Sequence, residues 1–258
     1  MSQFLIIPDR ENMKETLALA KEYNLGLELN EFMYPSVLDD TQKCIEIAQF
    51  YKKSGGNVMT SHGDFFDVLV FSEDKRIADI SKLRIMQSIE VSAKAGAKAV
   101  IFHSNIEPFL TGEAYRENWC NKNEEVFREI CKKYPDMNIY MENMFDTRPY
   151  DLANLGERMK DVKNFGICFD YAHAYLSNTF LSEWAKILSP YIKHVHINDN
   201  DKAGDWHWAL GDGTIDWSVL ARLREMYFPE ATILIEMNSI ENQLRSLEYL
   251  QSINLMRS

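Results

Sequence analysis

The 258-residue sequence has little of what marks several classes of protein. It contains only 11 glycines and 7 prolines, which excludes collagen-like and low-complexity chains. Its apolar fraction of 46% is too high for a disordered chain. No run of about 18 apolar residues occurs, so we expect no membrane span. The opening segment MSQFLIIPDR lacks a basic leader, and we therefore expect no signal peptide.

Motifs of several enzyme classes are missing as well. No GxGxxG fingerprint, phosphate-cradling P-loop or GxSxG elbow is present, which argues against dinucleotide-binding proteins and serine hydrolases. The four cysteines form no Cys-x-x-Cys pair, and this predicts reduced thiols and a cytoplasmic location. The formal net charge of −11 argues against a surface built to neutralise phosphates, so extensive contact with nucleic acid is disfavoured.

The sequence does contain a regular alternation of two patterns. Short apolar runs rich in Val, Ile, Phe and Tyr are typical of buried parallel strands, and they lie at residues 4–8, 26–32, 57–62, 97–103, 137–143, 165–171, 192–198 and 231–237. Amphipathic helical stretches separate them at residues 11–23, 40–53, 75–95, 115–133, 151–161, 182–189, 217–227 and 239–256. In the third stretch, the pattern places Ile77, Ile80, Leu83 and Ile89 on the apolar face.

Eight strand–helix units of about 32 residues each predict a single α/β domain, a (β/α)₈ TIM barrel formed by residues 1–258. An open doubly wound sheet is the alternative fold, but it fits eight strands less naturally and usually has a glycine fingerprint. In a parallel barrel, functional residues gather at the carboxyl ends of the strands. We therefore expect the candidate site at that end.

Histidines and carboxylates fall at six of these strand ends or in the loops that follow them. A lone histidine there is ordinarily a core residue, but three acids in apolar strands would repel one another unless a cation lay between them. Imidazoles and carboxylates without thiolates favour Zn²⁺, Mn²⁺, Fe²⁺ or Co²⁺ over Ca²⁺. The nine predicted metal ligands, sufficient for one to three ions, are His62, His103, Glu142, Asp170, His173, His196, Asp205, His207 and Glu236. His194 is expected one layer deeper, in a packing or supporting role.

These residues lie in segments that resemble the superfamily of xylose isomerase-like barrels, which joins sugar (phosphate) isomerases and epimerases with endonuclease IV. The most specific segment is HINDNDKAGDWHWALGDGTIDW (196–217), which resembles the pattern of His, then Asp-x-His, then Gly-x-Gly-x-Ile-Asp. CFDYAHAY, YMEN and TSHGDF resemble the superfamily's Asp-x-x-His, Glu-Asn and third-strand elements. GLELNEF is similar to the second strand of the sugar isomerase branch.

The resemblance implies one of two chemistries. In the epimerase branch, Glu142, Asp170, His196 and Glu236 would hold one Mn²⁺-like ion, and the two glutamates would move a proton on opposite faces of a ketose through a metal-stabilised enediolate. His173 would contact substrate oxygens. In the endonuclease IV branch, all nine residues would hold three zinc ions, and a metal-bound hydroxide would attack the phosphodiester beside an abasic site.

Several further residues are expected to line a pocket and bind the substrate. Aromatic side chains suit the C–H faces of a sugar, and lysine suits a phosphate or hydroxyl, although ordinary loop packing is the alternative for each aromatic residue. Arg148 stands where related ketose epimerases have an acid, which makes an anionic substrate more attractive. The candidates are Phe65, Trp119, Arg148, Tyr175, Lys202, Trp206 and Trp208.

We therefore predict a metal-dependent (Zn²⁺ or Mn²⁺) isomerase or epimerase of a small sugar or sugar phosphate, with Glu142, Glu236 and His173 as catalytic residues. The alternative is an endonuclease IV-like multi-zinc phosphodiesterase. The short acidic segment MYPSVLDD (33–40) lacks that enzyme's basic, aromatic-bearing loop and disfavours nucleic acid as a partner. A third alternative is a barrel that binds metal or sugar as a sensor. Apolar positions on the outer helices are compatible with an oligomer.

Overall fold

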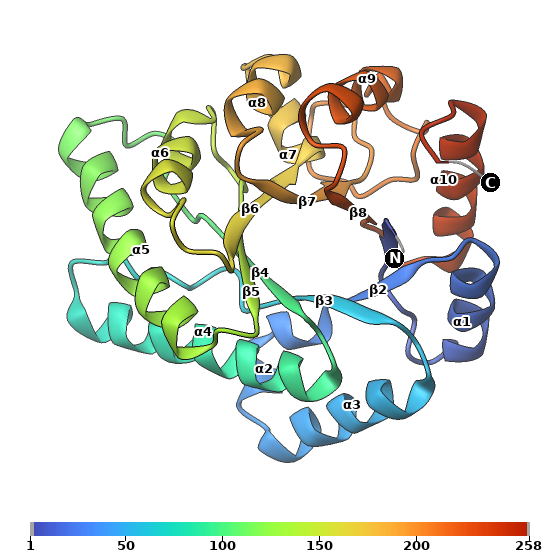
Figure 1. The fold of residues 1–258 in the computed structure, drawn as a ribbon, viewed down its shortest axis with the longest axis horizontal. Helices are drawn as coiled ribbons and strands as arrows, with labels where there is room; N and C mark the ends of the chain where they lie inside the picture. The colour runs from blue at the N-terminus through green and yellow to red at the C-terminus, as the bar shows by residue number, and fades with distance from the viewer. Residues whose placement is uncertain (1–2, 257–258) are drawn as a thin grey trace.

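The computed structural model describes residues 3–256, which form a closed barrel of parallel strands surrounded by helices (Figure 1). The strands are joined in sequence order, and the pairing of the first with the eighth closes the barrel. This confirms the predicted TIM barrel and shows that the open doubly wound sheet is wrong. The strands are β1 (Phe4–Ile6), β2 (Gly26–Leu29), β3 (Val58–His62), β4 (Ala99–His103), β5 (Asn138–Glu142), β6 (Phe165–Asp170), β7 (Ile192–Ile197) and β8 (Thr232–Ile235).

Each predicted helical stretch contains a helix of the outer ring. These helices are α1 (Met13–Glu22), α3 (Thr41–Ser54), α4 (Lys75–Ala95), α5 (Glu113–Lys133), α6 (Tyr150–Arg158), α8 (Leu181–Leu188), α9 (Trp217–Tyr227) and α10 (Ile240–Ser252). Three short helices in the loops were not predicted, because each is too short to show a helical period: η1 (Glu31–Met33), α2 (Pro35–Leu38) and α7 (Tyr171–Leu176). Among the described helices, none is long and apolar enough to cross a membrane.

The face that α4 buries differs from the prediction. Ile77, Ile80 and Leu83 are exposed, whereas the buried face includes serines. Ser81 Oγ accepts a hydrogen bond of 2.8 Å from the backbone N–H of Leu69, and Ser88 Oγ accepts one of 3.1 Å from Asp64. The helix therefore turns these serines toward the loop after β3, where their hydroxyls bind backbone N–H groups that would otherwise be buried without a partner. Three aliphatic side chains remain exposed as a result.

The interior of the barrel is layered along its axis. Leu5, Ile7 and Leu234 form a small apolar cluster against Met59, separate from the main core between strands and helices. Side chains alternate along each strand, so the inward positions of β2 and β7 include Glu28 and His194, which are fully buried. The polar layer is thus enclosed by protein, and it lies beneath the strand ends.

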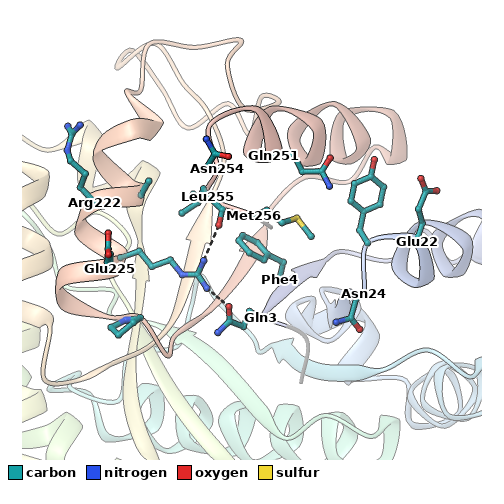
Figure 2. A pocket seen from close by; sticks show the side chains of 14 residues that line it. Gln3, Phe4, Glu22, Asn24, Arg222, Glu225, Gln251, Asn254, Leu255 and Met256 are labelled. Carbon is teal, nitrogen blue, oxygen red and sulfur yellow. Dashed lines mark hydrogen bonds between the residues drawn. The ribbon is translucent and has the colours of Figure 1, made fainter. Parts of the chain in front are cut away.

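A cavity of about 1060 Å³ lies at the opposite end of the barrel from those strand ends, around the start of β1 (Figure 2). Arg224 lines it and donates hydrogen bonds to the Leu255 carbonyl (3.3 Å) and to Oε1 of Gln3 (2.8 Å). Its guanidinium carbon lies 5.1 Å from the centre of the Phe4 ring. Among the described residues that line this cavity there is no histidine or cysteine, so the predicted metal ligands lie elsewhere.

Candidate metal centre

The nine predicted ligands come together at the carboxyl ends of the strands. His62, His103, Glu142 and Asp170 are the last residues of β3 to β6, and the others lie near the ends of β7 and β8 or in adjoining loops. Seven are buried, while Asp205 and His207 are partly exposed. A cavity of about 270 Å³ opens onto this end, and six of the nine line it: His62, His103, His173, Asp205, His207 and Glu236.

The innermost group consists of Glu142, Asp170 and His196, whose donor atoms lie within 4.8 Å of one another. Nδ1 of His196 lies 3.4 Å from Oε2 of Glu142 and 3.5 Å from Oε2 of Glu236. The carboxylates of Glu142, Asp170 and Glu236 thus lie around the His196 ring. Such a set of donors suits a divalent transition metal.

A second group shares Glu142 with the first. Nε2 atoms of His62 and His103 lie 3.1 Å apart, and they lie 3.4 Å and 3.6 Å from Oε2 of Glu142. Nδ1 of His62 lies 2.9 Å from the carbonyl of Gly63, which leaves Nε2 as the ring nitrogen that could bind a cation. Two imidazoles and a carboxylate can therefore hold a further ion.

A third group lies at the mouth of the cavity, where Asp205 sits between two histidines. Its Oδ2 lies 3.3 Å from Nε2 of His173 and 3.2 Å from Nε2 of His207. The Nδ1 atoms of these rings lie 2.9 Å from the carbonyls of Asn143 and Glu236. Each of the two rings therefore turns its Nε2 toward Asp205.

Local hydrogen bonds fix the residues of the inner group. Asp170 caps α7, since its Oδ1 accepts a hydrogen bond from the backbone N–H of His173. Asn143 joins the ends of β5 and β6, because its side chain donates to the carbonyl of Asp170 (2.8 Å) and accepts from its N–H (2.9 Å). The Asp-x-x-His and Glu-Asn motifs thus have structural roles as well as containing predicted ligands.

The loop between β7 and α9, which bears Asp205 and His207, is organised by Asp199. The buried carboxylate of Asp199 accepts hydrogen bonds from the N–H of Gly211 (2.8 Å), the N–H of Ile215 (3.3 Å) and the indole of Trp217 (3.0 Å). Asp199 also pairs with Trp208 in an antiparallel bridge. Because Asp199 lies two residues after the end of β7, these bonds fasten the loop with Asp205 and His207 to the barrel.

Charge and burial act in opposite directions on these groups. Burial raises the pKa of Asp170 to about 8. Burial would also raise the pKa of Glu142, but the charge of His196 outweighs it and holds that pKa well below its usual range. Burial lowers the pKa of His103 to about 3, so this ring is neutral and available as a ligand.

Buried atoms that lack a hydrogen-bond partner show whether these residues fit a metal ion. Both carboxylate oxygens of Glu142, Oδ2 of Asp170, Nδ1 of His196 and Oδ1 of Asp205 are buried without a hydrogen-bond partner among the described residues. Buried polar atoms of this kind cost several kcal/mol unless they are bonded. A divalent cation would satisfy them, and the ligand set therefore fits one or more such ions.

The predicted substrate-binding residues have different positions. Phe65 lines the cavity, with its ring edge-on to those of His62 and His103. The other five lie near the same end but are not among its lining residues: Arg148, Tyr175, Lys202, Trp206 and Trp208. Trp119 does not line it either, because it is fully buried and donates to the Ser104 carbonyl, which is a structural role.

Among these five, Trp206 and Trp208 stack with their ring centres 6.1 Å apart, on either side of His207 in the chain. Nζ of Lys202 lies 5.3 Å from the centre of the Tyr175 ring. Arg148 pairs with Asp151 at 3.3 Å. These contacts are all within the protein, so the role of the five residues in substrate binding stays a prediction.

Sequence reasoning missed several residues of the site. Glu28 lies beneath the metal ligands, with Oε1 3.1 Å from Nε2 of His196 and Oε2 3.0 Å from Nε2 of His194. Its only signal was an acid at an inward position of an apolar strand. Asn30, Met33 and Tyr34, which follow the end of β2, also line the cavity, although the sequence analysis did not assign them to the site.

Comparison with known proteins gives a consistent picture. The sequence profile of the xylose isomerase-like TIM barrels matches residues 10–258. The uncharacterized protein MJ1311 of Methanocaldococcus jannaschii is 29% identical over 209 residues, covering 75% of this chain and 70% of that protein.

Two solved structures share the fold over nearly their whole length. One is the TTHB071 protein from Thermus thermophilus, soaked with ZnCl₂, with a TM-score of 0.78, 24% identity and coverage of 99% and 100% of the two chains. The other is a D-tagatose 3-epimerase-like protein, with a TM-score of 0.75, 24% identity and coverage of 98% and 97%.

Proposed function

The chain belongs to the xylose isomerase-like TIM barrel family, and from that premise we propose that it is a divalent-metal-dependent isomerase or epimerase of a small sugar or sugar phosphate. One observation carries the proposal. Glu236 lines the small cavity while its Oε2 lies 3.5 Å from Nδ1 of His196, the nitrogen that Glu142 also approaches. A carboxylate is thus placed between a substrate-sized space and a site suited to a cation.

In the proposed mechanism, Glu142, Asp170, His196 and Glu236 would hold the cation. A bound divalent cation would polarise a carbonyl of the substrate. Glu236, which faces the cavity, would take the proton from the carbon next to that carbonyl, and Glu142 would act on the opposite face. His173 also lines the cavity and would bind a substrate oxygen through its ring.

The shape of the cavity supports a small substrate. Its volume of about 270 Å³ lies at the lower end of the range for ligand pockets. Apolar and aromatic side chains line one part of it, among them Ile7, Tyr34 and Phe65. Such walls suit the C–H faces of a sugar, whereas the histidines and acids suit its oxygens. We propose a carbohydrate as the substrate.

A second candidate function, a multi-zinc phosphodiesterase of the abasic-site type, is favoured by the outer ligands. A one-ion isomerase needs neither the pair His62 and His103 nor Asp205 and His207, yet all four are assembled here with His173. The net charge of −11 argues against an extended contact with DNA.

Proton exchange in D₂O tests the first function directly. Purified protein loaded with Mn²⁺ or Zn²⁺ is incubated with ketopentoses, ketohexoses and their phosphates, and exchange at the carbon next to the carbonyl is followed by NMR. We expect Glu236→Gln to slow exchange at least about 100-fold. The exposed Glu225→Gln is the matched control. Exchange at the wild-type rate in Glu236→Gln would show that the acid–base assignment is wrong.

The second function has its own assay. Incision of a duplex containing an abasic site by the wild-type protein, abolished by a chelator and by His207→Ala, would establish the phosphodiesterase. If neither exchange nor incision occurs although metal and sugar bind, the protein acts as a binding module.

A further inference from the structure

The histidines of the metal centre differ in which ring nitrogen faces the site. In His62, His173 and His207, Nδ1 lies 2.9 Å from a backbone carbonyl, and Nε2 points to the other ligands. His196 has the opposite orientation. Its Nδ1 faces Glu142 and Glu236, and its Nε2 lies 3.1 Å from Oε1 of the Glu28 carboxylate. Neither Nε2 nor Oε1 has a hydrogen-bond partner among the described residues.

The two oxygens of Glu28 have separate partners. Oε2 accepts a hydrogen bond of 2.5 Å from the hydroxyl of Thr60, and it lies 3.0 Å from Nε2 of His194. Nδ1 of His194 lies 2.6 Å from the hydroxyl of Thr232, which holds that ring in turn. Among the described residues, Oε1 has no hydrogen-bond partner, and it lies against Nε2 of His196. All of this occurs in a layer closed to solvent, since Glu28, His194 and His196 have no exposed surface.

A lone pair on Nε2 of His196 would face a carboxylate oxygen at 3.1 Å in a medium that screens charge poorly. When a cation binds, the ring therefore keeps its proton on Nε2, and this leaves the lone pair on Nδ1, toward Glu142 and Glu236. A carboxylate behind a ligating histidine also makes the ring a stronger donor to a metal.

We propose that Glu28 is a positioning residue that holds His196 in the tautomer protonated on Nε2 and so presents Nδ1 to the divalent cation. This inference rests on the proposed metal centre. It gives a role to the fully buried carboxylate of β2, which would otherwise lie in the barrel without function.

The first measurement uses the wild-type protein loaded with Zn²⁺ and labelled with ¹⁵N-histidine, because a bound cation leaves only one ring nitrogen of His196 protonated. Long-range ¹H–¹⁵N correlation identifies the protonated ring nitrogen of His196, whose signals are assigned by their loss in His196→Asn. We expect protonation on Nε2. Protonation on Nδ1 overturns the proposal, and this test needs no substitution at Glu28.

The second measurement is the affinity for Zn²⁺ or Mn²⁺, obtained by competition with a chelating dye. We expect Glu28→Gln to weaken binding by about 10- to 100-fold, because the amide of glutamine can face Nε2 with either its oxygen or its NH₂ group. Thr232→Val is the matched control, since it removes a contact to His194 and leaves the carboxylate at His196 in place. We expect its affinity to equal that of the wild type.

Equal affinity in Glu28→Gln and the wild type overturns the role of Glu28 and leaves the proposed function standing. Absence of Zn²⁺ and Mn²⁺ binding in the wild type overturns the metal centre, and the role of Glu28 with it. Failure of every sugar to exchange while the wild type binds metal counts against the proposed function alone.

Discussion

The Oδ1 atom of Asp170 accepts a hydrogen bond of 2.6 Å from the backbone N–H of His173. This bond caps α7 and sets the position of the histidine, while Oδ2 of the same carboxylate has no hydrogen-bond partner among the described residues. One side chain thus serves the local fold with one oxygen and offers the other to the inner group of ligands. A substitution here affects both roles.

We predict that the affinity for metal rises with pH. Burial raises the pKa of Asp170 to about 8, so this acid is protonated below pH 8 in the metal-free protein and must lose its proton to bind an ion. From this proton alone, affinity should fall about fivefold from pH 8 to 7 and about ninefold from pH 7 to 6. Calorimetry in two buffers of different ionisation enthalpy measures the protons released. An affinity that stays constant over this range would contradict the prediction.

A methyl group at Gly213 should loosen the loop that bears the outer ligands. A Cβ at this position would overlap with the carbonyl oxygen of Asn200 and the carboxylate of Asp199. We expect Gly213→Ala to lower the free energy of unfolding by about 1–3 kcal/mol and to reduce the number of zinc ions bound per chain. Gly112→Ala is the control, because its Cβ would meet no atom within 4 Å. Equal zinc content in the two variants would refute the role of Asp199.

Removing the charge of Asp146 should stabilise the protein at alkaline pH. Its buried Oδ2 accepts hydrogen bonds from Ser104 Oγ and from the N–H of Met144, and burial raises its pKa to about 6. A raised pKa favours folding below the unfolded-state value of about 4, and this contribution is lost as the pH rises through 6.

Asp146→Asn should therefore be more stable than the wild type at pH 8 by up to about 3 kcal/mol, and the difference should disappear near pH 4. Chemical unfolding at pH 4, 5, 6 and 8 measures it. The exposed Asp136→Asn should show no such trend. A difference that is independent of pH would mean that Asp146 is ionised in the folded protein at all these values.

Phe65 should affect binding of the substrate more than its turnover. It lines the cavity, whereas Trp208 is not among the lining residues. We expect Phe65→Ala to raise KM about tenfold with little change in kcat, because it removes apolar contact that the ground and transition states share. Trp208→Ala should leave KM unchanged. A larger effect at Trp208 would favour the substrate-binding role that the sequence predicts for it.

The sequence was most informative where its signal was local. Strands and long helices followed from periodicity, and the strand ends predicted that the nine candidate ligands lie together. The apolar face of α4 was wrong because periodicity takes no account of loop backbone groups, which Ser81 and Ser88 satisfy. Trp119 likewise belongs to the core, since its indole has a buried carbonyl to bind.

Glu28 could not be assigned from sequence for a different reason. Its partner His194 is 166 residues away, and the two meet only because the barrel closes. A glutamate in an apolar strand signals a buried acid, but nothing near it in the chain says what it contacts. Long-range electrostatic partners of this kind appear only once the register of the strands is known.

The sharing of Glu142 has a consequence for a divided chain. His62 and His103 precede β5, whereas Glu142 ends it, so a cut between α5 and β5 separates the members of the second group. Neither fragment alone then contains all three residues of this group. Zinc uptake by this group would therefore report that two separately produced fragments have reassembled, and the ion would act as the link that favours their association.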